Sequence, residues 1–222
     1  MGELTLPQLL AVAVLPLLFA ITVHEVAHGW VAKRLGDPTA QRLGRLTLNP
    51  VKHIDPVGTI LVPALLLVLG SLSGRPFIFG WAKPVPVTWE NLRSPKRDMA
   101  LVAVAGPLAN LLMAILWAFV FKLGTGLPAG ADWAATPLRH MGEFGIIINL
   151  VLMVLNLLPL PPLDGSRIAA SLLPGPLAWQ YGRLEPYGFF ILIALLATGV
   201  LGMILYPPVD FLLRLVIRIV GL

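Results

Sequence analysis

Long stretches without charged residues dominate the sequence. Four of them cover residues 4–23, 99–121, 144–163 and 186–209. Each is long enough to cross about 30 Å of hydrocarbon as an α-helix, which rises about 1.5 Å per residue. Because hydrocarbon offers no water to backbone polar groups, such stretches are expected to be helical. The pattern therefore predicts an all-α polytopic membrane protein.

Two further apolar stretches are less regular. Residues 56–74 are uncharged but contain two prolines and three glycines, which predicts a bent or re-entrant helix. Residues 211–222 carry Arg214 and Arg218 on one helix face, so this segment either spans the membrane or lies at its interface. In total we expect a bundle of about five to six transmembrane or re-entrant helices.

Basic residues are concentrated in the two loops that flank the stretch 56–74. The positive-inside rule places both loops in the cytoplasm, which requires that 56–74 does not cross fully. If it does cross, one basic loop lies on the wrong side. We favour the re-entrant interpretation, with the loop 124–140 outside. The basic residues are Lys33, Arg34, Arg42, Arg45 and Lys52 before the stretch, and Arg75, Lys83, Arg93, Lys96 and Arg97 after it.

Composition agrees with a membrane location. Hydrophobic residues make up 57% of the chain and charged residues only 12%, against about 25% charged in a soluble domain. Because the basic residues lie beside apolar segments, the net charge of +5 indicates contact with anionic lipid, and we expect no nucleic-acid partner. The absence of cysteine excludes disulfides and cysteine-ligated metals. We find no internal repeat and expect one domain over residues 1–222.

One segment between the apolar stretches favours extended structure. Residues 77–87 are rich in β-forming residues and contain Pro84 and Pro86. Proline is confined to the edges of sheets, so this pattern predicts a small membrane-associated β element with a free edge. Within the run from Pro84 to Pro86, only Val85 has an N–H, which we expect to be offered to a bound extended peptide.

The motif His24-Glu25-Val26-Ala27-His28 carries the sharpest chemical signal. Histidines at positions i and i+4 share one helix face, so His24 and His28 can bind the same metal ion. Glu25 lies beside them and can act as a general base. Ionisable groups at membrane depth are costly and usually functional. The alternative is a polar cluster that only stabilises the helix bundle, which three ionisable groups in five residues make a poor explanation.

A catalytic zinc ion usually has three protein ligands, so a third ligand is needed. Asp164 follows a proline-rich end of an apolar stretch, where its carboxylate could point back into the bundle. It could equally cap the helix that follows. Glu143 is the competing ligand, and His53 is a less favoured candidate for a position near the metal. The residues alone leave these alternatives open.

Asn149 and Asn156 lie seven residues apart and share a helix face. An asparagine in lipid must find a partner, so helix–helix hydrogen bonding is one interpretation. The functional interpretation is a donor that stabilises an oxyanion, and Asn156 is the better candidate because it lies nearer Asp164. The small residues of 105–110 indicate close helix packing.

Together these motifs resemble the site-2 protease family of intramembrane zinc metalloproteases, in its short branch without a PDZ or CBS domain. The matching parts cover most of residues 20–170 in the family's order. One departure is Ser166, where many members have a second glycine after Asp-Gly. The matching parts are HEVAH at 24–28, GRLTLNPVKHIDPVGT at 44–59, FGWAKPVPV at 79–87, AGPLAN at 105–110 and NLLPLPPLDG at 156–165.

The resemblance implies one zinc ion per chain held by His24, His28 and Asp164, with Glu25 as the base. Asn156 matches the family's asparagine upstream of Asp-Gly, and 77–88 resembles the family's substrate-presenting β element. The implied activity is hydrolysis of peptide bonds in transmembrane segments of regulatory proteins or signal-peptide remnants. We expect a multi-pass protein of the cell membrane whose site opens towards the cytoplasm. The alternatives are an intramembrane metal transporter and a non-catalytic zinc-binding membrane protein.

Overall fold

The computed structural model describes residues 5–62, 64, 65, 68 and 80–222, and these are helical or irregular. No strand is assigned among them, which confirms the all-helical class. The elements are α1 (Leu6–Arg34), α2 (Thr39–Arg42), η1 (Pro50–His53), η2 (Pro56–Leu61), η3 (Trp89–Asn91), α4 (Pro95–Thr125), α5 (Asp132–Asn156), α6 (Asp164–Leu172), α7 (Gly175–Gly182), α8 (Glu185–Ala197) and α9 (Val200–Val220).

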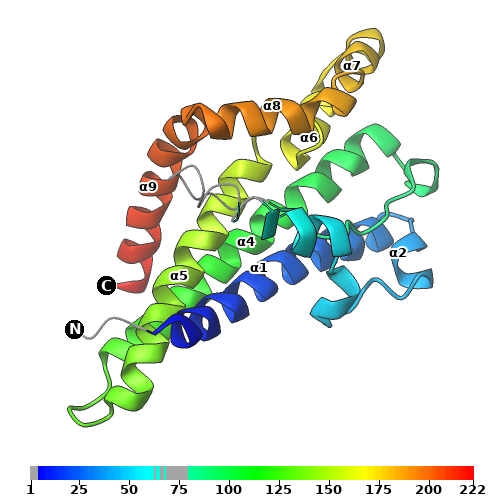
Figure 1. Ribbon diagram of the computed structural model, residues 1–222. Helices are drawn as coiled ribbons and strands as arrows, with labels where there is room; N and C mark the ends of the chain where they lie inside the picture. Colours follow the sequence, from blue (N-terminus) through cyan, green and yellow to red (C-terminus); the bar gives the residue numbers. More distant parts are fainter. Residues whose placement is uncertain (1–4, 63, 66–67, 69–79) are drawn as a thin grey trace.

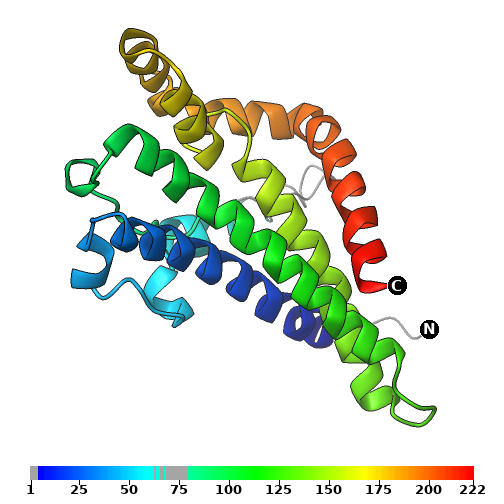
Figure 2. The same cartoon turned by 180° about the vertical axis from the view of Figure 1, so that it is seen from behind.

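Helices α1, α4 and α5 run side by side as the main bundle, and α9 lies against α5 and α4 (Figures 1 and 2). Small residues on α4 allow close approach to its neighbours. Large side chains of α4, α5 and α9 fill the space between these helices. The buried cluster consists of Ala114, Trp117, Ala118, Ile146, Leu150, Val216 and Val220.

Four described helices are long and apolar enough to cross a membrane, which makes this a multi-pass membrane protein. They are Leu10–Arg34, Pro95–Thr125, Asp132–Asn156 and Val200–Val220. The first three contain most of the predicted spans 4–23, 99–121 and 144–163.

The prediction of a single span over 186–209 is wrong. Helix α8 ends at Ala197, and Gly199 has a left-handed φ of 78° before α9 begins. Glycine adopts this conformation without a Cβ clash, so the apolar run changes direction there. The spanning candidate is α9, and the segment 211–222 belongs largely to that helix.

The basic loops gather at one end of the bundle. The Arg93 N–H donates to the Leu35 carbonyl at 3.1 Å, so the start of α4 lies beside the end of α1. At the opposite end, Lys122 Nζ donates to the Val220 carbonyl at 2.6 Å and joins the ends of α4 and α9. This arrangement satisfies the charge asymmetry that the sequence predicts, while the assignment of that end to the cytoplasm stays a prediction.

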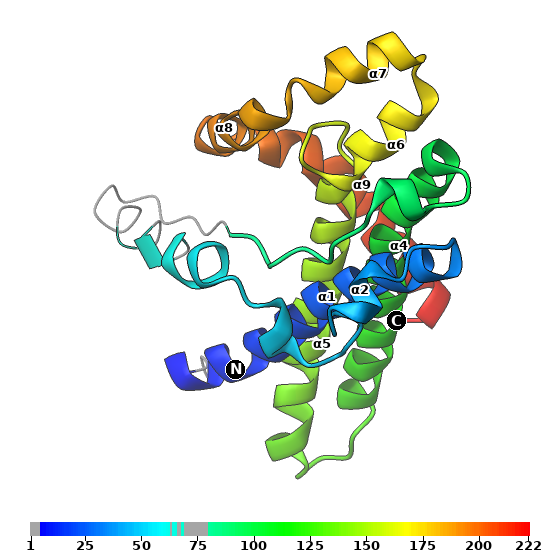
Figure 3. The same cartoon turned by 90° about the vertical axis from the view of Figure 1, so that its right-hand side faces the viewer.

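The two flanks of the stretch 56–74 meet each other. The Trp81 N–H donates to the Gly58 carbonyl at 3.0 Å, and the Lys83 N–H donates to the His53 carbonyl at 2.9 Å. The two flanks therefore lie side by side, which supports the re-entrant interpretation over a full crossing (Figure 3). The re-entrant helix itself stays a prediction, because residues 63, 66–67 and 69–79 lie outside the described residues.

Residues 80–88 form an extended segment without regular structure that passes beside α1. The predicted β element is therefore not shown by the described part, and residues 77–79 lie outside it. The side chain of Val85 is buried, and it packs beside Gly29 of α1 and Leu46. This contact places the segment next to the His24–His28 turn of α1.

Candidate active site and metal centre

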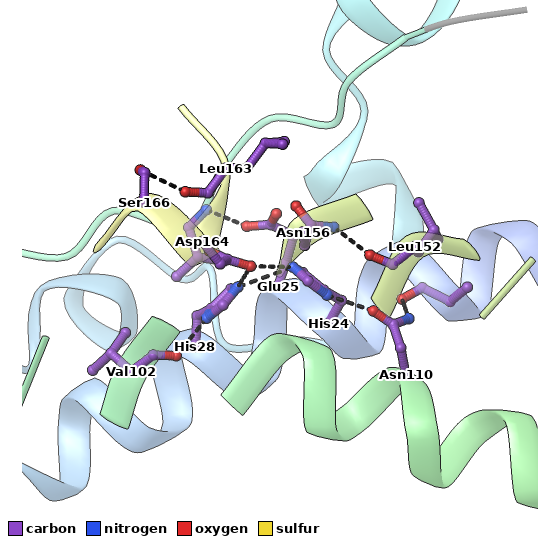
Figure 4. A network of polar contacts seen from close by, with 12 residues as sticks. His24, Glu25, His28, Val102, Asn110, Leu152, Asn156, Leu163, Asp164 and Ser166 are labelled. Carbon is purple, nitrogen blue, oxygen red and sulfur yellow. Dashed lines mark hydrogen bonds and ion pairs between the residues drawn. The ribbon is translucent and has the colours of Figure 1, made fainter. Parts of the chain in front are cut away.

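Three side chains from two helices converge on one point (Figure 4). His24 and His28 lie one turn apart on α1, as their spacing predicts, and their Nε2 atoms are 3.0 Å apart. Asp164, the first residue of α6, brings its Oδ2 atom to 3.1 Å from the Nε2 of His24 and 3.2 Å from that of His28. The structure thus gathers the three predicted ligands, and Glu143 is exposed and does not belong to this group.

The other ring nitrogen of each histidine is held by helix α4. The Nδ1 of His28 lies 2.7 Å from the Val102 carbonyl oxygen, which can only accept a hydrogen bond. The Nδ1 of His24 lies 2.6 Å from the Oδ1 of Asn110. In a neutral ring Nδ1 therefore carries the proton, which leaves the Nε2 atom that faces Asp164 available to a metal ion.

Asn110 is the residue that sequence reasoning missed, because it was attributed only to helix packing. Its Nδ2 donates to the Asn149 Oδ1 at 2.9 Å and to the Ala20 carbonyl at 3.2 Å. Both partners are acceptors, so the amide orientation is fixed and Oδ1 must face His24. Asn149 donates in turn to the Gly145 carbonyl at 2.8 Å, and both asparagines are fully buried. An asparagine inside a spanning stretch was the available signal.

Gly106 explains how the imidazoles lie so close to α4. A Cβ atom at this position would come within 2.5 Å of the His28 Cε1 and 2.6 Å of the His24 Cε1. Any side chain there would displace the two rings from their positions against α4. The small-residue patch 105–110 thus serves the site as well as helix packing.

Asp164 does not cap its helix, which was the alternative interpretation. Leu163 occupies the N-cap position of α6, and the Asp164 Oδ2 is buried without a hydrogen bond from any described residue. Its nearest polar neighbours among the described residues are the two imidazole rings, and a carboxyl group must be ionised to act as a metal ligand.

The donor set fits a divalent metal ion. Two imidazole nitrogens and a carboxylate oxygen face one another at 3.0–3.2 Å, so a cation among them could accept a lone pair from each. Ligand atoms about 2.0–2.1 Å from a tetrahedral ion lie about 3.3 Å apart, close to the spacing observed. Two imidazoles, one carboxylate and an open fourth position are typical of catalytic zinc.

Glu25 lies beside this cluster on α1, and its carboxylate is held from outside the helix. The N–H of Val85 donates to the Glu25 Oε2 at 2.6 Å. The expectation that this N–H is offered to a bound peptide therefore does not match the structure, in which it is already engaged. Sequence reasoning could not foresee the pairing, because it joins residues 60 positions apart.

Asn156 and His53 were the other two candidates from the sequence, and each forms its hydrogen bond with a backbone carbonyl group. The Nδ2 of Asn156 donates to the Leu152 carbonyl of its own helix at 2.9 Å, so its role as an oxyanion donor stays a prediction. His53 is buried, and its Nε2 lies 2.9 Å from the Thr47 carbonyl oxygen. It belongs to the contacts that hold the segment 80–88 and is not part of the metal-ligand group.

Comparison with known proteins relates the chain to zinc peptidases. The family model for peptidase family M50 matches residues 125–197, which include Asp164 but not the His24–His28 motif. The chain is 40% identical over 205 residues to the “Putative zinc metalloprotease YwhC” of Bacillus subtilis (strain 168), covering 91% of this chain and 88% of that one. No solved structure gives a significant match.

Two more distant relatives carry the same kind of name. “Putative zinc metalloprotease Rip2” of Mycolicibacterium smegmatis is 30% identical over 185 residues, covering 83% of this chain and 66% of the relative. “Putative zinc metalloprotease MJ0611” of Methanocaldococcus jannaschii is 33% identical over 171 residues, covering 76% and 72%. This chain belongs to peptidase family M50, the site-2 protease-like metalloendopeptidases.

Proposed function

We propose that this chain is a zinc-dependent intramembrane endopeptidase that hydrolyses peptide bonds in transmembrane segments of other proteins. The observation that carries the proposal is the convergence of His24, His28 and Asp164 beside Glu25 at the end of a spanning helix. The relatives named as zinc metalloproteases support zinc as the ion, one per chain. When bound, zinc would activate water and polarise the scissile carbonyl group.

In this proposal the chain's own residues move the proton and hold the charge. Glu25 takes a proton from water at the site and later gives it to the leaving amine. His24, His28 and Asp164 keep the ion in place, and the α4 carbonyl and amide groups keep the two rings oriented. Asn156 would donate to the oxyanion only after its amide group turns away from the Leu152 carbonyl. Substrate binding could drive this rotation.

The segment 80–88 is the proposed substrate edge. A helix hides its carbonyl groups, so the cleaved region must be extended, and backbone pairing would hold it open. Within this segment the N–H groups of Ala82 and Val87 have no hydrogen-bond partner among the described residues, whereas those of Trp81, Lys83 and Val85 do. The free donors are thus the ones available to a substrate strand.

The location follows the charge distribution. We propose a multi-pass protein of the cell membrane with the basic loops, and therefore the open side of the site, towards the cytoplasm. Its partners are the lipid bilayer and a transmembrane protein or peptide substrate.

The test compares wild type with Glu25→Gln after reconstitution into liposomes with a panel of single-span membrane peptides. Glu25→Gln keeps every ligand and removes the base, so zinc content should stay normal while cleavage falls about 10²–10⁴-fold. Wild type should cut inside the membrane segment of at least one peptide. Equal cleavage by the variant would contradict the mechanism. Zinc movement across the liposome by both proteins without cleavage would favour a transporter.

A pair of variants at Ala82 tests the proposed substrate edge. Ala82→Pro removes an N–H that has no hydrogen-bond partner among the described residues, so KM should rise while zinc content stays unchanged. Ala82→Ser keeps the N–H and should behave as wild type. If Ala82→Pro leaves KM unchanged, this segment does not pair with substrate there.

A further inference from the structure

The contact between Val85 and Glu25 depends on the position of a segment that has no regular structure of its own. An N–H donor 2.6 Å from a carboxylate oxygen is a close, charge-assisted hydrogen bond. A hydrogen bond of this kind weakens steeply when the donor moves or turns. Other contacts must therefore fix residues 80–88 against α1.

Arg45 holds the segment just before Val85. Its side chain is buried and donates from Nη2 to the Lys83 carbonyl at 2.8 Å, with a longer contact of 3.4 Å to the Pro84 carbonyl. The Lys83 N–H donates to His53 on the other side, so both backbone groups of Lys83 are fixed. A buried guanidinium group whose Nη2 donates to two backbone carbonyls fixes the segment and is not a surface charge.

Asp37 holds the segment just after Val85. Its carboxylate is almost fully buried and accepts from the Thr88 N–H at 2.7 Å, from Asn91 Nδ2 at 3.0 Å and from the Thr39 N–H at 3.0 Å. Burial raises the pKa of Asp37, but its hydrogen bonds outweigh burial and lower the pKa. The carboxylate is therefore charged at neutral pH and ties Thr88 to the end of α1.

The two clamps leave little freedom between them. Only four residues separate Lys83 from Thr88, and two of them are prolines with a fixed φ. The N–H of Val85 is thus presented to α1 by a short, stiff segment that is attached at both ends. The Oε2 of Glu25 is held there, which leaves Oε1 for the proposed proton transfer.

We propose that Asp37 and Arg45 are positioning residues for Glu25, acting through the backbone N–H of Val85. The inference rests on the proposed function in one respect, that Glu25 is the base. An anchored carboxylate keeps its free oxygen in the orientation that proton transfer needs. Displacement of a reacting group by about 1 Å can cost about 10²-fold in rate. Neither residue need touch the substrate.

The first test measures single-turnover cleavage, KM and zinc content of the reconstituted full chain. Val85→Pro removes the N–H and should lower the cleavage rate constant about 10- to 100-fold with normal zinc content and KM. Arg45→Gln and Asp37→Asn should lower the same rate constant by smaller factors. Arg45→Lys keeps a donor for the Lys83 carbonyl and should recover part of the loss.

Matched controls separate positioning from general damage. Arg42→Gln removes an exposed arginine from the same loop, and Asp132→Asn removes an exposed aspartate at the other end of the bundle. Both should cleave as wild type. A rise in KM at an unchanged rate constant in Arg45→Gln and Asp37→Asn would overturn the proposal, because it would show that the segment only binds substrate.

The second test needs no cleavage. If the Val85–Glu25 hydrogen bond exists in solution, Val85→Pro should lower the thermal midpoint more in the wild-type background than in the Glu25→Ala background. Equal shifts in both backgrounds would overturn the inference. A wild-type protein that cleaves none of the membrane peptides would instead contradict the proposed function, so the two failures are distinguishable.

Discussion

The two halves of the metal centre are held in opposite ways. On α1, His24 and His28 are buried and each Nδ1 has a partner on α4, so the rings are oriented before any ion arrives. On α6, Asp164 follows a proline-rich turn, and the close polar contacts of its buried Oδ2 are with the two imidazoles. One half is preorganised by helix packing, whereas the other depends on the histidines and on the metal ion.

The largest expected effect comes from the half that depends on the ion. Asp164→Asn replaces an ionised ligand with a neutral amide, so zinc affinity and cleavage should both collapse. Asparagine keeps the size of the side chain and can donate to an imidazole nitrogen, so the thermal midpoint of the zinc-free protein should change little. Zinc titration and a thermal scan of the chelated protein check both statements. Zinc affinity equal to that of wild type would move the third-ligand role to another residue.

The preorganised half should respond differently. Asn110→Leu keeps the volume but leaves the His24 Nδ1 and the Asn149 Oδ1 without a partner. Loss of such an outer partner typically weakens metal binding about 10- to 100-fold. The unsatisfied buried groups should also destabilise the zinc-free protein by about 1–3 kcal/mol each.

Asn149→Leu provides the graded control for this chain of amides. It frees the Asn110 amide but leaves the Asn110 Oδ1 near His24, so zinc affinity should fall less than in Asn110→Leu. The proposed difference between the two halves of the metal centre would be contradicted if Asn110→Leu changed only zinc affinity. It would also be contradicted if Asp164→Asn destabilised the zinc-free fold as much as Asn110→Leu does.

The smallest expected effect on stability comes from variants that test the membrane topology, on which the comparison of the two halves depends. Cysteine labelling is clean because the chain contains no cysteine. Cysteines at Gln41 and Glu90, both exposed in the basic loops, should label from one side without loss of stability. A cysteine at Ala129, between α4 and α5, should label from the other side. Labelling of Gln41 and Glu90 from opposite sides would contradict the paired flanks at Gly58 and Trp81.

The sequence predicted the parts of this site that depend on local spacing. The i, i+4 histidines needed only a helix, and the uncharged stretches predicted three of the four spans. Asp164 could not be assigned from the residues alone, because a ligand and a helix cap share the same sequence pattern, and only the resemblance favoured a ligand. The turn at Gly199 was missed because the run 186–209 is apolar on both sides of it.

The remaining features depend on distant neighbours. Asn110 meets His24 across 86 residues, and the Val85 N–H meets Glu25 across 60. No periodicity or motif specifies such pairs, since they arise from how α4 and the segment 80–88 pack on α1. A polar residue within an apolar span was the only available hint, and it should be followed to a partner even where the surrounding residues suggest packing.

X-ray absorption at the zinc edge of the purified wild-type protein tests the central claim most directly. The account predicts one zinc ion per chain with two imidazoles and light oxygen ligands in its first shell. In the Asp164→Asn protein any retained zinc should keep the two imidazoles, because α4 holds those rings in place. A wild-type first shell with one imidazole or three, or zinc bound equally well by a variant with both His24→Ala and His28→Ala, would contradict the account.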